Sequence, residues 1–391
     1  METLGGFPNL PAMVRAEHEG ASEASGGRGW RCRSRSPRRG KLGGSPRGLI
    51  PRVYVSGACY AKTMRAMVLK QQGEALEMCD IAMPEAGPSQ IRLRVKACGL
   101  CRTDLHVVDG DLKEPKLPLV PGHQIVGVID QVGADVRGLA VGDRVGVPWL
   151  GGSCGHCRFC QAGDENLCDN ARYTGYQIDG GFADHCVADA RFCFALPAEQ
   201  DDVTVAPLLC AGLIGYRALR MTGDATELGF YGFGSAAHLM TQVARHQGRR
   251  VYAFTRAADV ASRDFALGLG ATWAGPSDQR PGVELDAAIL FAPAGELLPL
   301  ALKAVRKGGT VVCAGIHMSD IPSFPYALLW GERVVRSVAN LTRRDGVDFL
   351  AVARTMSIVA KTTVYGLEDA NRALDDLRRG DVQGSVVLRP Y

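Results

Sequence analysis

The sequence predicts an α/β fold in which a unit of short strands is followed by a doubly wound parallel sheet. From residue 64 to about 205, short strands such as QIRLRVKACGL alternate apolar and polar residues between Gly and Asp turns. From about residue 206, apolar strands such as LGFYGFG, RVYAFT and TVVCAGI alternate with helical patterns. Those patterns lie near residues 235–247, 259–269 and 296–306. Such alternation is typical of parallel strands joined by helical crossovers.

The composition is that of a water-soluble globular protein. The 391 residues are 46% hydrophobic and 22% charged, enough for two or three domains. No apolar run approaches the roughly 20 residues that span a membrane, so we expect no membrane segment. The N-terminus lacks a charged head followed by an apolar run, which argues against a secretory signal. We therefore expect a cytoplasmic protein.

Residues 1–63 differ from the rest of the chain. They contain eleven Lys or Arg residues against four Glu, and residues 26–48 are rich in Gly, Ser, Pro and Arg. Such a segment buries too little apolar surface to offset its chain entropy, so we expect a disordered basic tail. A nucleic-acid-binding arm and an organelle presequence are alternatives, and we favour an extension that precedes Met64. The nearly neutral remainder of the chain argues against nucleic-acid binding.

Four cysteines lie within the stretch CGHCRFCQAGDENLC. Their spacing is C-x2-C-x2-C-x7-C, and the chain holds thirteen cysteines in total. Disulfides are rare in the cytosol, so the spacing indicates a metal site. Four thiolates fill a tetrahedral zinc shell and leave no position for substrate, which predicts a structural zinc. The expected ligands are Cys154, Cys157, Cys160 and Cys168.

A dinucleotide-binding turn is indicated by YGFGSAAHL, which follows an apolar strand and begins a helix. Gly232, Gly234 and Ala237 fit the pattern G-x-G-x-x-[GA]. The first Gly permits a tight turn, the second lets a pyrophosphate approach the backbone, and the Ala permits close helix packing. The phosphates would then face the N-terminus of the helix.

The next strand ends in VYAFTR, where an acidic residue often binds the ribose of NAD. Here Thr255 is followed by Arg256, so a carboxylate that would repel a 2′-phosphate is missing. Arg256 could pair with that phosphate, which favours NADP or the use of both cofactors. An Arg256 that stacks on adenine or points into solvent is the alternative.

Three separate motifs each offer one ligand of the type that zinc prefers. Cys101 lies in CGLCRTDLH, His123 in PGHQIVG and Cys210 in LLCAG. Three protein ligands with one open position are the plan of a catalytic zinc site. Sequence spacing alone does not show that residues so far apart converge.

Together these motifs resemble those of the zinc-dependent medium-chain alcohol dehydrogenases over nearly all of residues 64–391, closest to the bacterial propanol-preferring branch. The resemblance implies a GroES-like catalytic domain formed by residues 64–214 and 339–391, with a Rossmann domain over 215–338 inserted between them. It also implies two zinc ions per chain, NAD or NADP as cofactor, and a homodimer or homotetramer.

The same resemblance assigns roles to the site residues. The three ligands named above would bind the catalytic zinc, with an alcohol oxygen at the open position. The hydroxyl of Thr103 would accept the alcohol's proton and pass it through the cofactor ribose to His106 and water. Asp104 would orient His123 from behind. A surface His and a helix-start Asp are the alternatives for His106 and Asp104.

Two positions depart from the family pattern. Gln124 follows the ligand His where the family usually has Glu, which leaves the site one charge less negative. Ile214 stands where the family often has Thr against the nicotinamide. Neither change removes a zinc ligand, so we expect effects on rate and substrate range rather than on reaction class.

The sequence therefore predicts an enzyme that transfers a hydride between a primary or secondary alcohol and NAD(P). The alternatives are an aldehyde-preferring zinc reductase and a non-catalytic zinc scaffold whose basic tail binds nucleic acid. The substrate is a small alcohol or aldehyde that the sequence does not specify. Trp149 and Leu150 are candidates for the walls of its pocket, with a role in the core as the alternative.

Overall fold

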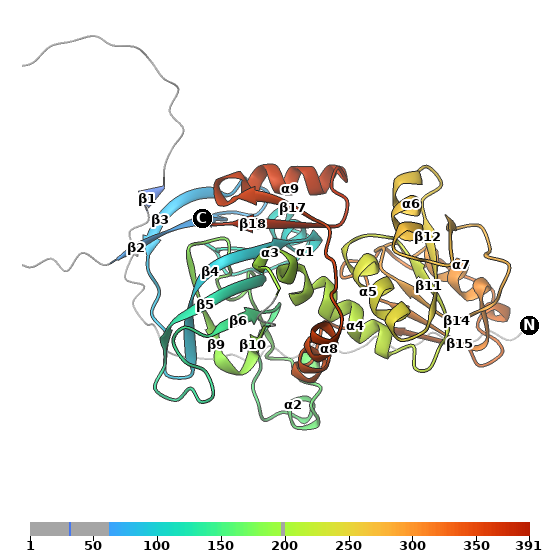
Figure 1. The fold of residues 1–391 in the computed structure, drawn as a ribbon, viewed down its shortest axis with the longest axis horizontal. Coiled ribbons are helices and arrows are strands. Elements are labelled where there is room, and N and C mark those ends of the chain that lie inside the picture. Colours follow the sequence, from blue (N-terminus) through green and yellow to red (C-terminus); the bar gives the residue numbers. More distant parts are fainter. Residues whose placement is uncertain (1–30, 33–61, 197–199) are drawn as a thin grey trace, which may run out of the picture.

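The computed structural model describes residues 31–32, 62–196 and 200–391. The predicted disordered tail, residues 1–63, lies outside the described residues except for 31–32 and 62–63. Two lobes lie side by side (Figure 1). The β-rich lobe contains β2 to β10 together with the C-terminal β17 and β18, and the parallel-sheet lobe contains β11 to β16. Within the part of residues 1–63 that is described, Arg31–Cys32 forms β1 and pairs with β3.

The main sheet of the β-rich lobe runs β10-β6-β5-β4-β18-β17, with β9 also paired to β4. Its strands are β4 (Gln90–Leu100), β5 (Gln124–Val132), β6 (Arg144–Val147), β9 (His185–Asp189), β10 (Phe194–Ala195), β17 (Thr362–Gly366) and β18 (Ser385–Arg389). A smaller sheet joins β1 to β3 (Glu77–Ala82) and β2 (Thr63–Val68). The alternation expected for QIRLRVKACGL is present, because Ile91, Leu93 and Val95 are fully buried while Arg94 is exposed.

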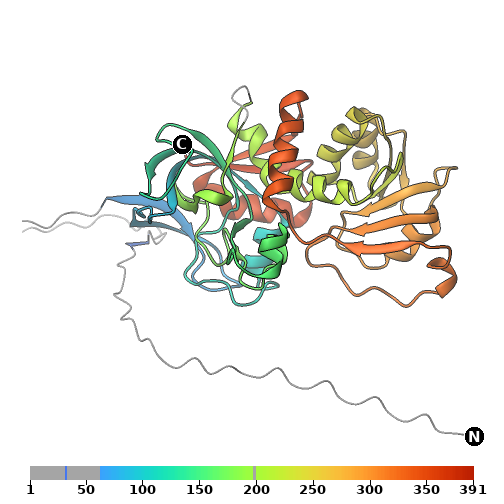
Figure 2. The ribbon, with the colours of Figure 1, turned by 90° about the horizontal axis from the view of Figure 1, so that it is seen from below.

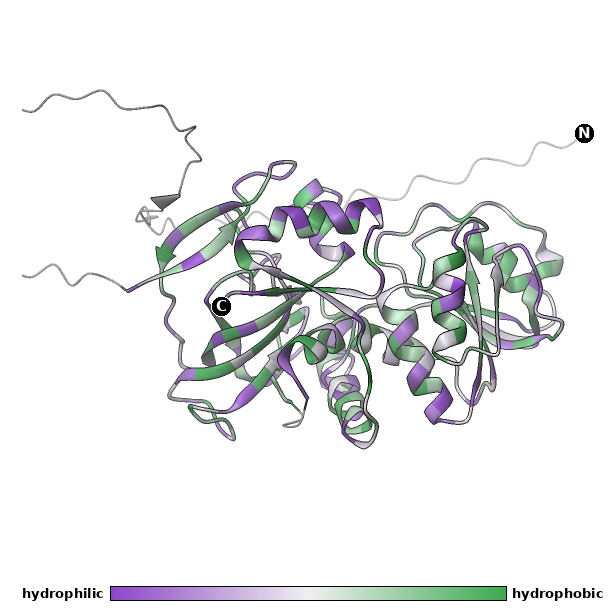
Figure 3. Ribbon diagram, turned by 45° about the horizontal axis from the view of Figure 1, so that its top comes forward, coloured by the Kyte–Doolittle hydropathy of each residue, from purple (hydrophilic) through white to green (hydrophobic). Residues whose placement is uncertain are grey.

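The chain returns to this lobe at its C-terminus. Strand β18 lies antiparallel to β4, with Val386 opposite Leu100. The helix α9 (Ala370–Arg379) lies beside it and carries both hydrophobic and hydrophilic residues, as expected of a helix with one buried face (Figure 3). The last strands of the chain therefore complete the sheet to which β4 belongs.

The second lobe contains six parallel strands in the order β13-β12-β11-β14-β15-β16. They are β11 (Glu227–Tyr231), β12 (Arg250–Thr255), β13 (Trp273–Pro276), β14 (Leu285–Leu290), β15 (Val305–Cys313) and β16 (Val334–Ser337). Numbered from β11, this order is 3-2-1-4-5-6, that of a dinucleotide-binding doubly wound sheet. The predicted α/β fold class is confirmed.

Helices cover both faces of the parallel sheet. They include α5 (Ser235–His246), α6 (Val260–Gly268) and α7 (Leu297–Ala304), close to the helical segments that the sequence predicts. Leu228 and Phe230 share a hydrophobic cluster with α5, whereas Tyr231 and Phe254 share another with α7. The alternating side chains of β11 thus face two separate layers.

The remaining helices lie in the β-rich lobe or between the two lobes. These are α1 (Arg102–Asp109), α2 (Arg158–Ala162), α3 (Asp202–Val205), α4 (Ala211–Arg220) and α8 (Arg343–Thr355). No single helix in the described ranges is long and apolar enough to cross a membrane, and the bent pair Asp202–Leu209 and Ala211–Arg220 that has such a length and composition is mostly buried in the core.

A buried carboxylate fastens α8, which lies between the two lobes (Figure 2), to α4. Asp345 accepts hydrogen bonds from Thr342 N at 2.9 Å, from Arg217 at 2.6 Å and from Arg220 at 2.8 Å. Burial opposes ionisation of this group, but the hydrogen bonds from Thr342 and Arg217 lower the pKa of Asp345 below its ordinary value. The carboxylate is therefore ionised in the folded protein at neutral pH.

We expect Asp345→Asn to reduce the free energy of unfolding by about 3 kcal/mol at pH 7, because it leaves two guanidinium groups with a weakened partner. A depressed pKa stabilises the fold above the unfolded pKa near 4, and this contribution is lost as pH falls through the folded pKa. The difference in the free energy of unfolding between wild type and Asp345→Asn, measured by urea denaturation, should therefore shrink below pH 4. Asp348→Asn, at a more exposed carboxylate on the same helix, is the control and should cost less than about 0.5 kcal/mol. An equal loss in both variants would contradict this account.

Candidate active site and zinc centres

Three remote segments bring Cys101, His123 and Cys210 together. Cys101 precedes α1, His123 precedes β5, and Cys210 lies between the short 3₁₀ helix Ala206–Leu209 and α4. The Sγ atom of Cys101 lies 3.3 Å from His123 Nε2 and 3.9 Å from Cys210 Sγ. All three ligand atoms lie within 4.8 Å of one another. The convergence that sequence spacing could not show is thus present.

One carboxylate positions two of these three residues. Asp104 accepts a hydrogen bond from Cys101 N through Oδ2 at 2.9 Å, as in a capping box at the start of α1. Its other oxygen, Oδ1, lies 3.1 Å from His123 Nδ1. Both side chains are almost completely buried. With Nδ1–H donated to the carboxylate, the lone pair of Nε2 points toward the two sulfur atoms.

A steric constraint explains why the PGH motif contains glycine. Gly122 has a φ of +96°, and a Cβ there would lie 2.4 Å from the ring of Phe182. Another residue would be strained in this conformation and would displace the ring. The local chain therefore turns sharply and leads His123 into the interior before β5 begins.

The donor set fits a zinc ion. Burial opposes a charge on the imidazole, but the Asp104 carboxylate and the Cys101 thiolate more than offset it and raise the pKa of His123 to about 10. The same negative potential attracts a metal cation in place of the proton. Two sulfurs and one imidazole nitrogen are ligands that Zn²⁺ prefers, and three ligands leave one tetrahedral position for substrate.

The predicted proton-handling residues lie along α1. Thr103 is buried in the first turn, and His106 follows one turn later. The Nδ1 atom of His106 lies 2.8 Å from Asp111 Oδ2, and its ring centroid lies 5.2 Å from that of His317. Sequence reasoning did not identify Asp111 or His317. A His-x4-Asp spacing across a helix end is a weak signal that could have pointed to Asp111, and we find none for His317.

The two departures from the family pattern occupy different surroundings. Gln124 is buried, and its Oε1 would lie 2.6 Å from a Cβ added at Gly99, so a larger residue there would displace it. Its Nε2 has no hydrogen-bond partner among the described residues. Ile214 is half-buried on α4, with its backbone N–H donated to Cys210 O.

Of the two candidate wall residues, Trp149 contacts the site. Its ring meets that of His123 edge-on at 4.8 Å and stacks on Tyr173 at 5.1 Å and on Tyr176 at 5.8 Å. Leu150 is fully buried, as expected of a core residue. The aromatic stack gives one side of the site an apolar wall.

The four-cysteine lobe is a second cluster. The Sγ atoms of Cys154, Cys157, Cys160 and Cys168 all lie within 4.8 Å of one another. Gly155 and Gly163 have φ values of +79° and +80°, which let the chain fold back around the cluster. Backbone hydrogen bonds at His156 and Cys157 lower the pKa of the Cys154 thiol to about 6. Four such sulfurs fit a closed structural zinc site.

The dinucleotide turn has the geometry that the sequence predicts. Gly232 has a φ of +88°, and a Cβ there would lie 2.7 Å from Ala292 Cβ. Open space lies beside Gly234, which leaves room for a phosphate to approach the backbone. Ala237 is fully buried against the sheet, and α5 begins directly after the turn at Ser235.

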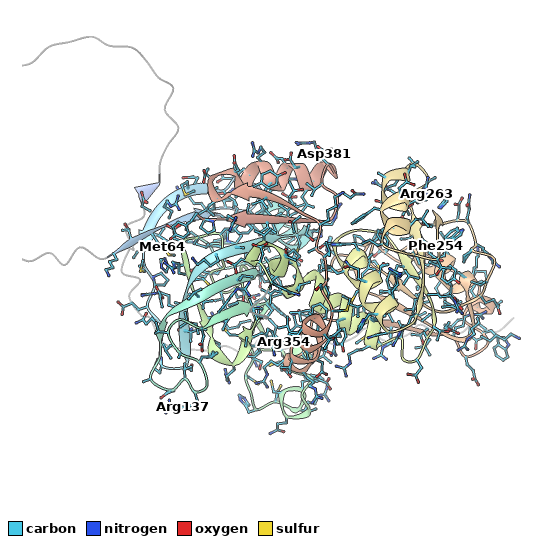
Figure 4. All side chains as sticks on the ribbon, viewed as in Figure 1. Met64, Arg137, Phe254, Arg263, Arg354 and Asp381 are labelled. Carbon is cyan, nitrogen blue, oxygen red and sulfur yellow. The ribbon has the colours of Figure 1, made fainter. Side chains whose placement is uncertain are left out.

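A second arginine lies at the end of β12. Thr255 is buried there and Arg256 is exposed. Arg263, labelled on α6 in Figure 4, donates to Thr255 Oγ1 at 3.2 Å and to the carbonyl of Arg256 at 3.0 Å. Two arginines therefore lie at or near the end of β12, the part of a doubly wound sheet beside which the adenosine ribose of a dinucleotide is held. Sequence reasoning identified Arg256 but not Arg263.

Comparisons with known proteins agree with this geometry. Residues 87–198 match the GroES-like domain of alcohol dehydrogenases. A probable alcohol dehydrogenase, AdhA, of Mycobacterium tuberculosis is 44% identical over 338 residues, which are 83% of this chain and 97% of that protein. A cinnamyl alcohol dehydrogenase of Sorghum bicolor has a TM-score of 0.77 at 27% identity, covering 84% of this chain and 98% of its own. A cobalt- and zinc-bound thermostable alcohol dehydrogenase of Pyrobaculum aerophilum has a TM-score of 0.77 at 25% identity, and the match covers 84% of this chain and 100% of that protein.

The chain belongs to the zinc-dependent medium-chain alcohol dehydrogenases. It is an NAD(P)-dependent oxidoreductase that interconverts alcohols and their carbonyl compounds, and the reaction class and the cofactors expected from the sequence are confirmed. The resemblance to the propanol-preferring branch stays a prediction.

We expect two zinc ions per chain by plasma mass spectrometry of the purified protein, because each cluster offers a complete ligand set. Cys101→Ser should lose one zinc and keep the other, since the four-cysteine lobe is a separate site. Cys157→Ser should lose the other zinc and, unlike Cys101→Ser, unfold at a lower temperature, because the loop loses its internal support. Loss of both ions in Cys101→Ser would contradict the two-site assignment.

Proposed function

We propose that the cluster of Cys101, His123 and Cys210 is the catalytic zinc site and that alcohol is oxidised beside it. The observation that carries the proposal is the approach of three ligand atoms from remote segments to within 4.8 Å, with a buried carboxylate behind the imidazole. When bound, zinc supplies a Lewis acid for the alcohol oxygen, and the nicotinamide accepts the hydride.

The protein's own residues orient the substrate and handle its proton. The Thr103 side chain hydrogen-bonds the Cys101 thiol, and in this proposal its hydroxyl accepts a hydrogen bond from an alcohol that enters the open position. His106, one helical turn on, takes up the proton and releases it to water, because an imidazole nitrogen can act as a proton shuttle. On the side where Trp149 packs on His123, this indole and the tyrosines stacked on it exclude water.

We propose a preference for NADP over NAD. The end of β12 carries Thr255 in place of an acidic residue, and Arg256 and Arg263 place two positive groups there. Of the two, Arg256 is exposed, and its guanidinium has no hydrogen bond or ion pair in the part of the chain that the structure describes; only its backbone carbonyl is bonded. It is therefore available to a 2′-phosphate, whereas Arg263 is held by backbone carbonyls.

We also propose a homo-oligomer whose subunits meet at β16. This strand ends the parallel sheet, so within the described ranges one of its edges has no neighbouring strand and can pair. Tyr326, Trp330 and Val334 are 67%, 66% and 47% exposed beside it, an apolar edge of a kind that commonly marks a protein interface. A second copy of the chain related by a two-fold axis would extend the sheet across both subunits.

We expect Cys101→Ser to reduce kcat/KM for alcohol oxidation by about 10³-fold or more, which corresponds to a loss of roughly 4 kcal/mol in transition-state stabilisation. The matched control is Cys193→Ser, because this thiol, among the residues that the structure describes, bonds the carbonyl of Asp189 alone, and the change should leave the rate within twofold. The measurement is NADPH or NADH absorbance with a panel of primary and secondary alcohols. Turnover by Cys101→Ser at the wild-type rate would refute the site.

We expect Arg256→Ala to lower the ratio of kcat/KM for NADP to that for NAD by about tenfold, the loss of one charge-assisted hydrogen bond. Arg137→Ala, at an exposed arginine in the β-rich lobe, is the control and should leave the ratio unchanged. An unchanged ratio in Arg256→Ala would show that this residue does not select the cofactor.

A further inference from the structure

Asp111 is a carboxylate outside every motif of the sequence, and it lies against His106. Its Oδ2 atom is 2.8 Å from His106 Nδ1, and the side chains are 45% and 15% exposed. The carboxylate therefore reaches solvent while the imidazole is largely enclosed. Asp111 belongs to neither of the two candidate metal clusters.

The backbone holds Asp111 in this place. Helix α1 ends at Asp109, and Gly110 takes the left-handed conformation with a φ of +90°. The chain then folds back, and Leu112 N donates to the carbonyl of His106 at 3.0 Å. The side-chain amide of Gln72 donates to two carbonyls of the same turn at 2.7 and 2.8 Å. The contact is thus the product of a braced helix end and not of two freely rotating side chains.

The contact also determines which nitrogen of His106 carries hydrogen. An ionised carboxylate only accepts hydrogen bonds, so Nδ1 must be the donor. The hydrogen bond with His106, assisted by the charges of His317 and Lys113, lowers the pKa of Asp111, which is therefore ionised at neutral pH. A neutral imidazole with hydrogen on Nδ1 has its lone pair on Nε2. That Nε2 is buried and has no partner among the described residues.

We propose that Asp111 is a positioning residue that holds His106 with Nε2 as the proton acceptor of the alcohol dehydrogenase reaction. This inference rests on the proposed role of His106. The proton that leaves the alcohol O–H becomes the Nε2–H of an imidazolium, Nδ1–H stays with Asp111, and the Nε2 proton then passes to water. The hydride leaves separately for the nicotinamide, as in the established reaction. Free imidazole in water favours hydrogen on Nε2, and without Asp111 the acceptor would face the wrong way.

Groups from both lobes face His106. His317, on the loop after β15 in the parallel-sheet lobe, places its ring at 51° to that of His106 with centroids 5.2 Å apart. Asp111 and Lys113 follow α1 in the β-rich lobe. Of Asp111 and His317, the two groups in contact with the His106 ring, only the carboxylate stabilises a positive ring, whereas a protonated His317 would repel it; Lys113 acts on the Asp111 carboxylate.

The direct test is the tautomer of His106 in the zinc-loaded protein without alcohol or nucleotide. Nitrogen-15 NMR of histidine-labelled enzyme should show hydrogen on Nδ1 of His106, with the resonance assigned by its absence in His106→Gln. Asp111→Ala should move that hydrogen to Nε2, and Asp111→Glu should restore the wild-type pattern. The control is Asp109→Ala, because Asp109 is a carboxylate of similar exposure two residues away that pairs with Arg378 at 2.7 Å. It should leave the tautomer unchanged.

Kinetics supply the second measurement. Asp111→Ala should lower kcat for alcohol oxidation about tenfold with KM for the alcohol within twofold, because proton acceptance and not binding is affected. In a His106→Gln background the same change should alter kcat less than twofold, since its target is gone. Asp109→Ala should have the wild-type kcat.

The outcomes separate this inference from the function on which it rests. An unchanged tautomer in Asp111→Ala, or an undiminished kinetic effect of Asp111→Ala in His106→Gln, would overturn the positioning role. If the His106 tautomer changes in Asp111→Ala as expected but His106→Gln keeps the wild-type rate, the tautomer assignment is supported. The role of His106 in proton transfer is then overturned. Zinc content and thermal unfolding of each variant show whether it is folded.

Discussion

The buried contact of Asp104 with His123 is the constraint on which the site depends. Because the same carboxylate also accepts the N–H of Cys101, it fixes two ligands from different elements with one side chain. An unpaired carboxylate at this depth would cost several kcal/mol, so the groups around it have little freedom to rearrange. The charge that Asp104 brings offsets the desolvation of the imidazole and makes the cluster attractive to a cation. Geometry and electrostatics of the centre thus have a common origin.

The arrangement of the lobes brings the remaining parts to this centre. Cys210 lies where the chain leaves the β-rich lobe along α4, and the dinucleotide turn follows the first strand of the parallel sheet that α4 leads to. The C-terminal β18 returns to β4, the strand that leads directly to Cys101. Residues that are more than 100 positions apart therefore meet because the two sheets are built from interleaved segments. The joint at Asp345 holds α8 to α4 in the region between the lobes.

The sequence was sufficient for the fold class, for a doubly wound parallel sheet and for the types of residue in the two candidate metal clusters, but neither the number and order of the strands nor the convergence of the ligands could be predicted from it. The features that could be predicted depend on periodicity, on turn-forming Gly residues and on ligand types, all of which are visible along one chain. Asp111, Arg263 and His317 were not found, because their importance comes from contacts made after folding. Asp111 contacts His106 across the end of α1, and His317 contacts the same histidine from the other lobe. Arg263 donates from α6 to backbone carbonyls that follow β12. No local pattern distinguishes such residues from ordinary surface charges.

The edge-on packing of Trp149 against His123 has an optical consequence. A protonated imidazole in van der Waals reach of an indole quenches its fluorescence by accepting an excited electron, whereas a neutral ring coordinated to a cation does so weakly. The indole beside the centre is thereby a natural emission probe of whether a proton or an ion occupies the imidazole. Filling of the centre could then be followed in real time without any label.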